Sequence, residues 1–326
     1  MNTTRRELLA GAAGVVSLAA WPARSGSLGP PPAPSAEIAA QVGTYGTPQD
    51  IVIVYEADGR ALAEGRGLKA APADRLAFER DAQGAVTAVV IGSERLARRD
   101  FGAETQAAIQ AGVKADPARL RAQALAASPP LEAGPRRPAD LVDLTTVDPA
   151  IRLDIRYATA NNFMGFPLYE RAAAYLQRPA AQALGRAAAA LKAHGYGLLI
   201  HDAYRPWFVT KMFWEATPAE ARVFVADPAE GSRHNRGCAV DLTLYDLASG
   251  EPLEMTGRYD EMSIRSYPDF VGGTSRQRWL RDLLRREMER QGFTVYPQEW
   301  WHFDYRDWPL YGIGTATFTE LSNLRR

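Results

Sequence analysis

The chain has 326 residues, of which 46% are hydrophobic and 23% are charged, so its composition is that of a globular protein of about two domains. Its 38 Lys and Arg residues balance 38 Asp and Glu residues. A net charge of zero does not supply the basic surface that nucleic acids or anionic membranes require, so we expect neither as a partner. The single cysteine, Cys238, excludes an intrachain disulfide.

The first 23 residues have the features of an export signal. Arg5 and Arg6 precede an apolar stretch that is short for a membrane span, and Ser-Leu-Ala at 17–19 offers small residues for a cleavage site. The segment resembles a twin-arginine signal, with a fortuitous amphipathic N-terminus as the alternative. We therefore expect 1–23 to be a signal peptide and the mature chain, without an integral membrane segment, to be periplasmic or extracellular.

Residues 24–40 are rich in Pro, Gly and Ser and are expected to form a linker. Over residues 41–103, short apolar runs at 51–55, 76–80 and 86–91 are separated by turn-forming residues, a pattern that predicts a small all-β accessory domain. Because no set of catalytic residues lies in this segment, its expected role is structural support or the binding of an unknown partner.

Residues 104–137 are expected to form a helical connector, with Asp116 and Pro117 at the N-cap and first turn of its second helix. The Pro-rich segment 128–138 then ends the helical pattern. In the remaining part, 138–326, strands and helices do not alternate regularly, which predicts an α+β fold rather than a doubly wound parallel sheet. The expected helices are 179–194, 207–226 (broken at Pro218) and 274–291, and the expected strands are 196–201, 240–245, 293–296 and 301–305.

All four histidines lie in this C-terminal part, and two of them belong to motifs with metal-binding residue types. Segment 232–241 reads S-R-H-N-R-G-C-A-V-D and contains His234 and Asp241, while 299–302 reads E-W-W-H and contains Glu299 and His302. Imidazole and carboxylate groups are good zinc ligands, and a catalytic zinc needs three protein ligands, a water and a neighbouring base. Either histidine by itself is more often a structural residue than a ligand.

Together these motifs resemble the zinc D-alanyl-D-alanine dipeptidases of the vancomycin-resistance and stationary-phase type, which share the Hedgehog/DD-peptidase fold. The pattern S-x-H-x-x-G-x-A-x-D followed by E-x-W-H carries the resemblance. It extends to Y-A-T-A-N-N-F-M-G at 157–165, D-A-Y-R-P at 202–206 and R-Y-D-E-M at 258–262. The resemblance covers 138–312 and implies that residues 138–326 form a zinc dipeptidase domain with this fold.

The resemblance implies that His234, Asp241 and His302 bind one zinc ion per chain and that Glu299 is the catalytic base. In the implied reaction, Glu299 takes a proton from zinc-bound water and later passes it to the leaving amine.

The resemblance also implies three roles toward the substrate. Arg205 would stabilise the oxyanion, Asp260 would receive a free ammonium group and Ser232 would contact the substrate. The structural alternatives are a strand-end salt bridge for Arg205 and a turn carboxylate for Asp260. Ser263 stands where the family tends to be acidic, so the substrate pocket is expected to differ there.

The remaining candidates have simpler interpretations. Cys238 is interpreted as a small filler rather than a fourth ligand, because strand alternation places it off the ligand face. His194 and His201 match no ligand of the family and are expected to be structural. Trp300 and Trp301 are expected to wall the substrate pocket, with packing as the alternative.

The leading hypothesis is an exported, zinc-dependent dipeptidase that cleaves D-Ala-D-Ala or a related small dipeptide. A D,D- or L,D-carboxypeptidase that trims peptidoglycan shares the ligands and the base, and Asp260 favours the dipeptidase because it selects a free amino terminus. The alternative from another class is a non-catalytic, zinc-containing binding module. Glu299 and Arg205 argue against that module, because a structural zinc needs neither a base nor an oxyanion partner.

Overall fold

The computed structural model describes residues 29–65, 68–71, 75–114 and 116–323. The expected signal peptide, 1–23, and the first part of the expected linker, 24–28, lie outside the described residues. Within the described ranges, no helix is long and apolar enough to cross a membrane.

The N-terminal part is an antiparallel sheet with its own core. Its strand order is β4-β3-β2-β1-β7-β6-β5. Tyr45, Val52 and Val54 are completely buried in a hydrophobic cluster that is separate from the cluster of the C-terminal part. The strands are β1 (Gly43–Thr47), β2 (Asp50–Ala57), β3 (Arg60–Gly65), β4 (Leu68–Ala71), β5 (Leu76–Arg80), β6 (Val86–Ile91) and β7 (Glu94–Arg99). The prediction of an N-terminal all-β region is therefore confirmed.

The end of the segment expected to be a linker contains a helix, α1 (Ala36–Gln41). Its N-cap is Ser35, whose hydroxyl accepts a hydrogen bond from the Ile38 amide at 3.3 Å. Helix α1 contacts β2 and β3, and Ile38 packs against the core of the sheet. One apolar side chain and one cap thus order residues whose composition predicted a linker.

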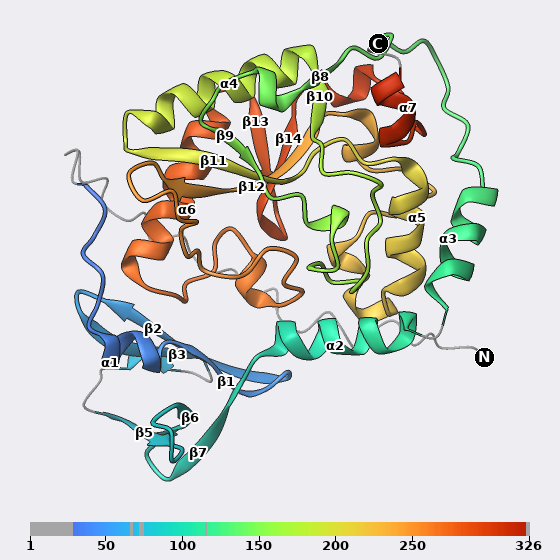
Figure 1. Cartoon of the computed structure of the whole chain (residues 1–326). Coiled ribbons are helices and arrows are strands. Elements are labelled where there is room, and N and C mark those ends of the chain that lie inside the picture. Colours follow the sequence, from blue (N-terminus) through green and yellow to red (C-terminus); the bar gives the residue numbers. More distant parts are fainter. Residues whose placement is uncertain (1–28, 66–67, 72–74, 115, 324–326) are drawn as a thin grey trace, which may run out of the picture.

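Two helices connect the N-terminal sheet to the C-terminal part. Asp100 caps α2 (Phe101–Val113) and Asp116 caps α3 (Pro117–Ala126), each by accepting a hydrogen bond from a first-turn amide. Pro117 lies at the start of α3, as predicted. Figure 1 shows α2 between the N-terminal sheet and the loops of the C-terminal part, and α3 beside α5 (Trp207–Ala216), which it contacts.

The C-terminal part is built on a five-stranded sheet with the order β13-β14-β12-β11-β9. Its pairs are antiparallel except for β9 with β11, which is parallel. In β12, the completely buried Leu242 and Leu244 alternate with Asp241 and Thr243, so the two sets point to opposite faces. The strands are β9 (Ile151–Leu153), β11 (Tyr196–Asp202), β12 (Ala239–Asp246), β13 (Phe293–Tyr296) and β14 (Glu299–Tyr305), with a separate pair of β8 (Leu141–Asp143) and β10 (Tyr175–Gln177).

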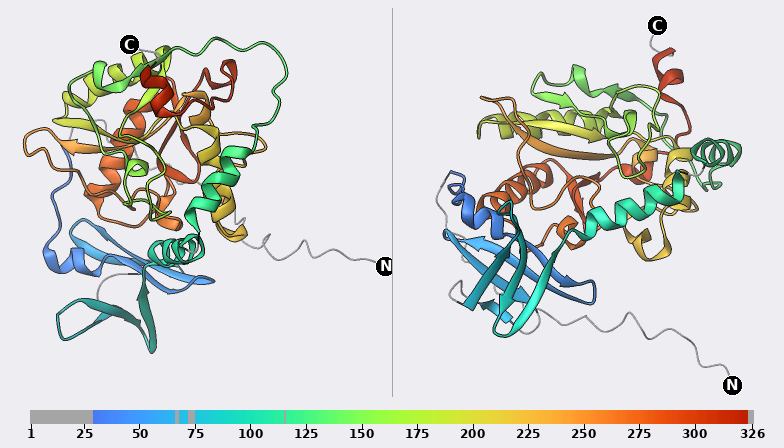
Figure 2. Two further views of the ribbon diagram at one scale, coloured as in Figure 1. Left: turned by 45° about the vertical axis from the view of Figure 1, so that its right-hand side comes forward. Right: turned by 60° about the horizontal axis from the view of Figure 1, so that its bottom comes forward.

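Helices α4 (Arg178–Lys192) and α6 (Ser275–Glu289) pack against this sheet and against each other. A capping box of Thr274 and Gln277 starts α6, and Leu280, Leu283 and Leu284 lie on its buried side. A short helix, α7 (Phe318–Asn323), follows the last strand. Figure 2 shows the helices and the mixed sheet as one body beside the N-terminal sheet, which confirms the predicted α+β class.

Two irregularities occur in the sheet where the candidate residues lie. The pairing of β11 with β12 shifts between Ile200 and Asp202, so His201 is an extra residue and Asp202 stands opposite Asp241. The pairing of β13 with β14 also shifts, near the start of β14. Because a bulge re-aims the side chains beside it, residues near these two points do not follow strict alternation.

We predict that Leu283→Ala lowers the free energy of unfolding by about 2 to 5 kcal/mol, because Leu283 of α6 is completely buried in the core. Urea unfolding measures the loss as a lower transition midpoint. The control is Arg285→Ala on the same helix, which breaks only a half-exposed ion pair with Glu289 and should cost less than about 0.5 kcal/mol. Equal losses in both variants would contradict the described packing of α6.

Candidate active site

His234 lies in a short 3-10 turn, His234–Arg236, that precedes β12. Gly237 ends the turn with a φ of 65°, a left-handed conformation that glycine adopts without strain. The Nδ1 atom of His234 lies 2.6 Å from the carbonyl oxygen of Ala203. Because a carbonyl can only accept, Nδ1 carries the proton and Nε2 keeps a lone pair for a ligand.

Asp241 and His302 are directly paired residues of β12 and β14. His302 Nδ1 lies 3.0 Å from Asp241 Oδ1 and 3.0 Å from His234 Nε2. His234 Nε2 lies 3.2 Å from the same carboxylate oxygen. The structure therefore brings together the three side chains that the motifs indicated, with one donor atom of each converging on a common point.

This group of three buried residues could hold a metal ion. Among the residues that the structure describes, Asp241 Oδ1 is buried and accepts no hydrogen bond. Lone pairs on two imidazole nitrogens and a carboxylate oxygen repel one another at these distances unless a cation lies between them. Two nitrogen donors and one oxygen donor suit a divalent transition ion such as zinc better than calcium or magnesium, which prefer oxygen ligands.

Asp304 orients the second histidine of the group. Its Oδ1 lies 2.9 Å from Nε2 of His302, so Nε2 carries the proton and Nδ1 faces the other two donors. Although burial opposes the shift, His302 holds the pKa of Asp304 below its usual range. Sequence analysis missed this residue, and its position two residues after His302 on the same strand is the signal that could have indicated it.

Glu299 lies beside the three donor residues. Its Oε2 is 3.7 Å from Nδ1 of His302. Burial raises the pKa of Glu299 to about 8, which makes this carboxylate a stronger base than an exposed one. The register shift in β14 explains how residues 299 and 302, which strict alternation would place on opposite faces, meet on one side of the strand.

Arg205 is held by Asp202, whose Oδ2 accepts a hydrogen bond from Nε at 2.9 Å and forms an ion pair with a second guanidinium nitrogen at 2.9 Å. A guanidinium nitrogen also lies 3.6 Å from Asp241 Oδ2, and the guanidinium stacks over the ring of Phe213 at 4.7 Å. The salt bridge considered as an alternative for Arg205 is therefore present. It is buried and fixes a guanidinium that borders the same cavity as the three donor residues.

Asp260 adopts a φ of 59°, a strained conformation for a residue other than glycine that persists only when its surroundings hold it. Its Oδ1 accepts a hydrogen bond from the Tyr157 hydroxyl at 2.9 Å. Its Oδ2 is buried and has no partner within the described part of the chain. Burial, followed by the nearby charge of Asp241, raises the pKa of this carboxyl well above its usual range.

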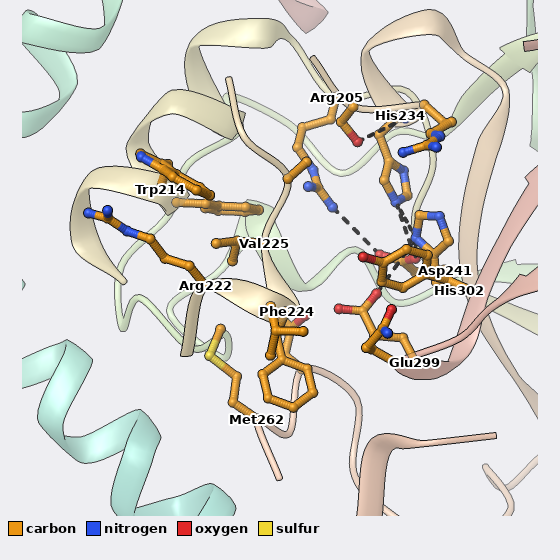
Figure 3. Close-up of a pocket in the computed structure, with 18 of the residues that line it drawn as sticks. Arg205, Trp214, Arg222, Phe224, Val225, His234, Asp241, Met262, Glu299 and His302 are labelled. Atoms are coloured by element: carbon orange, nitrogen blue, oxygen red, sulfur yellow. Dashed lines mark hydrogen bonds and ion pairs between the residues drawn. The ribbon is translucent and has the colours of Figure 1, made fainter. Parts of the chain in front are cut away.

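One cavity of about 300 Å³ is bordered by all seven candidate residues. Figure 3 shows Arg205, Glu299 and the three donor residues gathered on one side of it. The opposite wall contains the apolar side chains of Trp214, Phe224, Val225 and Met262, together with Arg222, whose guanidinium lies over the Trp214 ring at 4.5 Å. Ser232 is buried at the edge of the donor group, where its hydroxyl oxygen accepts a hydrogen bond from the His234 amide at 3.2 Å.

The two tryptophans that were expected to line this cavity line two different cavities. Trp301 lines this one, whereas Trp300 lines a second cavity. The expectation for Trp300 is therefore wrong. The two rings meet edge to face at 5.4 Å, so both also serve as packing.

Cys238 and the other two histidines, His194 and His201, lie outside the group of three donor residues. Cys238 is completely buried in the hydrophobic core, and burial raises its pKa to about 12, so the thiol stays protonated and is a poor ligand. His194 is exposed after the end of α4. His201 is buried and stacks on the ring of Tyr259 at 4.5 Å.

Three side chains around the candidate residues were not assigned from the sequence. The Tyr259 hydroxyl donates to Asp241 Oδ2 at 3.1 Å, Tyr157 donates to Asp260, and Asp202 orients Arg205. Each belongs to one of the stretches R-Y-D-E-M, Y-A-T-A-N-N and D-A-Y-R-P that extend the family resemblance, which was the available signal.

A mostly antiparallel sheet thus carries a buried His–Asp–His group that could hold a metal ion, with Glu299 and the buried Arg205 beside it, an arrangement compatible with a peptidase. The sequence profile of the Peptidase M15 family, described as D-ala-D-ala dipeptidase, matches residues 137–319, so the chain belongs to this family. The family expected from the sequence is therefore confirmed.

Similar proteins each cover about half of the chain. The D-alanyl-D-alanine dipeptidase of Escherichia coli (strain K12) is 36% identical over 168 residues, which are 51% of this chain and 84% of that protein. The D-alanyl-D-alanine dipeptidase of Enterococcus faecium is 36% identical over 177 residues, 49% of this chain and 88% of that protein. A solved structure of the LdcB LD-carboxypeptidase overlaps 52% of this chain and 69% of that chain, with 20% identity and a TM-score of 0.29.

We predict that Asp304→Asn weakens metal binding by about 10- to 100-fold, because the amide replaces the charged partner that fixes His302. Competition with a chelator measures the change. Asp307→Asn is the matched control, because Asp307 follows the same strand and pairs only at 3.7 Å with the exposed Arg137 and at 3.9 Å with Arg306. Equal metal affinity in the two variants would contradict the role of Asp304.

Proposed function

We propose that this chain is an exported, zinc-dependent dipeptidase that hydrolyses D-Ala-D-Ala or a closely related free dipeptide. His234, Asp241 and His302 would hold one zinc ion per chain, since two imidazoles and a carboxylate are a common catalytic zinc donor set. When bound, zinc would act as a Lewis acid toward both a peptide carbonyl and a water molecule. The export signal expected at 1–23 places this activity outside the cytoplasm.

The observation that carries the proposal is the unpartnered Oδ2 of Asp260 in the wall of the same cavity as the donor group, among the described residues. A buried carboxylate oxygen without a partner is costly, and an ammonium group would supply the missing charge and hydrogen bonds. A free dipeptide carries such an ammonium next to its scissile bond. The strands of a cross-linked cell wall do not, so Asp260 favours small free peptides.

Glu299 is the residue suited to move the proton. Burial raises the pKa of Glu299, so its ionised form is a stronger base toward the attacking water than an exposed carboxylate. Its position 3.7 Å from His302 Nδ1 keeps it beside the donor group without being one of the three converging donors. The same carboxyl can then give the proton to the leaving amine.

Arg205 and Ser232 are suited to orient the substrate. The hydrogen bond and the ion pair with Asp202 fix the Arg205 guanidinium, so its positive charge is in place where negative charge develops on the carbonyl oxygen. The Ser232 hydroxyl accepts from the His234 amide and retains its own proton for a substrate oxygen. These buried polar groups argue for catalysis and against a non-catalytic binding module.

The test is the release of free D-alanine from D-Ala-D-Ala by the mature, zinc-loaded protein, with N-acetyl-D-Ala-D-Ala and L-Ala-L-Ala alongside. Turnover of D-Ala-D-Ala alone is expected. Cleavage of the acylated peptide alone would instead identify a cell-wall carboxypeptidase. No cleavage of the three peptides by protein with bound zinc would exclude the proposed substrate.

We predict that Glu299→Gln keeps its zinc but loses turnover by about 100- to 10,000-fold, because the amide cannot accept the proton. Metal content and kcat are measured on the same sample. His302→Ala is the comparison and should lose zinc and turnover together, since it removes one of the three donors. Unchanged turnover in zinc-loaded Glu299→Gln would refute the role of this carboxylate.

We predict that Asp260→Asn raises KM for D-Ala-D-Ala by about 10- to 100-fold, because it replaces a charged partner of the ammonium with a neutral one. Asparagine keeps the acceptor for the Tyr157 hydroxyl, so the fold should be retained. Propionyl-D-alanine, which has the same length but no ammonium, serves as a competitive inhibitor for comparison. If its inhibition constant rises as much as KM does, Asp260 does not bind the ammonium.

A further inference from the structure

Residues that precede the catalytic domain contact the loop that carries Asp260. Asp100, the cap of α2, accepts two hydrogen bonds from the guanidinium of Arg258 at 2.8 and 2.7 Å. Gly102 of α2 lies against Glu261, so that a Cβ added at Gly102 would stand 2.3 Å from Cγ of Glu261. The chain is thus held two residues before Asp260 and one residue after it.

Glu261 is fixed firmly enough to transmit this contact. It is 4% exposed, and its carboxylate accepts hydrogen bonds from the Arg258 amide at 2.9 Å and the Ser263 hydroxyl at 2.8 Å. The Ser266 hydroxyl donates to its backbone carbonyl. A buried side chain with these partners cannot yield at Cγ without moving the backbone beside it, which belongs to the same loop as Asp260.

A second cavity lies between Asp260 and α2. This cavity, of about 470 Å³, is bordered by Gln106 of α2 and by Tyr259, Asp260 and Glu261. Asp260 also borders the first cavity, so its loop stands between two cavities. Because its φ of 59° is strained, the position of its carboxylate depends on the contacts that hold the loop. These are the Tyr157 hydrogen bond to Asp260, the packing of Tyr259 on His201, and the contacts of Arg258 and Glu261 with α2.

We propose that Asp100 and Gly102 are positioning residues for the ammonium site at Asp260, so that α2 helps to set the affinity for free dipeptides. This inference rests on the proposed function, which assigns the substrate's ammonium to Asp260. Both residues lie before residue 137, where the family match begins, and therefore outside the part that this chain shares with the dipeptidase family.

The bond to Asp100 has a second effect. Arg258 lies two residues from the unpartnered carboxylate oxygen of Asp260, and half of its side chain is exposed. A free guanidinium there would compete with a substrate ammonium for the same oxygen. Because Asp100 binds two nitrogens of the Arg258 guanidinium, this guanidinium pairs with Asp100 and not with Asp260. Loss of that bond therefore weakens ammonium binding both by loosening the loop and by releasing a competitor.

Gly102→Ala is the sharpest test, because the added Cβ meets Glu261. Gly112→Ala is its matched control, since it replaces a glycine of the same helix at a position where an added Cβ meets nothing within 4 Å among the described residues. Both changes favour the helix equally. We expect Gly102→Ala to raise KM for D-Ala-D-Ala about tenfold with kcat changed by less than about twofold, and Gly112→Ala to change neither.

Asp100→Asn tests the ion pair, since asparagine still caps α2 but carries no charge. We expect KM to rise about threefold, because a half-exposed pair contributes modestly. The double variant Asp100→Asn/Arg258→Gln should raise KM no more than Arg258→Gln alone does, because both substitutions break the same ion pair. Glu56→Gln is the control, since Glu56 joins the N-terminal sheet to Ser275 at 2.7 Å, at a contact that involves no residue of the Asp260 loop.

Two further measurements, together with the KM values, decide the interpretation. The inhibition constant of propionyl-D-alanine and the zinc content should be unchanged in Gly102→Ala and Asp100→Asn, because neither depends on Asp260. If KM is unchanged in both variants while Asp260→Asn raises it, the inference fails and the proposed function stands. If Asp260→Asn also leaves KM unchanged, the ammonium assignment of the proposed function fails. Equal increases in the Gly112→Ala or Glu56→Gln controls would overturn the specific roles of Asp100 and Gly102.

Discussion

The site depends on a surplus of buried negative charge. Asp241, Asp260 and Glu299 border one cavity, and Asp202 lies behind Arg205, which pairs with both Asp202 and Asp241. Burial raises the pKa of Asp202, Asp260 and Glu299, because the nearby positive charge, which includes Arg205, does not offset the loss of water around these carboxylates. Buried carboxylates are stable only when they are paired, protonated or bound to a cation. A divalent ion at the three donor residues and an ammonium at Asp260 would each remove part of this surplus, so the same imbalance favours both the cofactor and the substrate.

The features that could be predicted from the sequence are those carried by local spacing. The strands and helices of the C-terminal part follow from apolar periodicity, and the capping residues Asp116 and Thr274 mark the starts of their helices. The three donor residues were recognisable because His234, Asp241 and His302 belong to two compact motifs. The structure adds why these motifs meet: β12 and β14 are neighbouring strands, and their register pairs residue 241 with residue 302.

The features that could not be predicted depend on register shifts and on contacts between distant segments. The bulge at His201 places Asp202 opposite Asp241. A sequence does not show where the register of strand pairing shifts by one residue. Trp300 was misassigned for the same kind of reason, since only the register of β14 decides which of two adjacent tryptophans faces the first cavity. The contact of Gly102 with Glu261 joins residues 159 positions apart, and no local pattern indicates it.

An ammonium site imposes opposing demands on the loop that carries it. Asp260 must be held in place despite its strained backbone, yet its Oδ2 must stay unpartnered, because an internal hydrogen bond to that oxygen would compete with the substrate. Support from within the loop risks that competition, since the loop itself carries a basic residue, Arg258, two positions before Asp260. Support from α2 avoids it: Asp100 is itself an acid and draws Arg258 toward itself, while Gly102 has no side chain and acts by backbone contact alone. A carboxylate and a glycine therefore suit the proposed role, since both can brace this loop without donating a hydrogen bond from a side chain to the oxygen that the proposed substrate would bind.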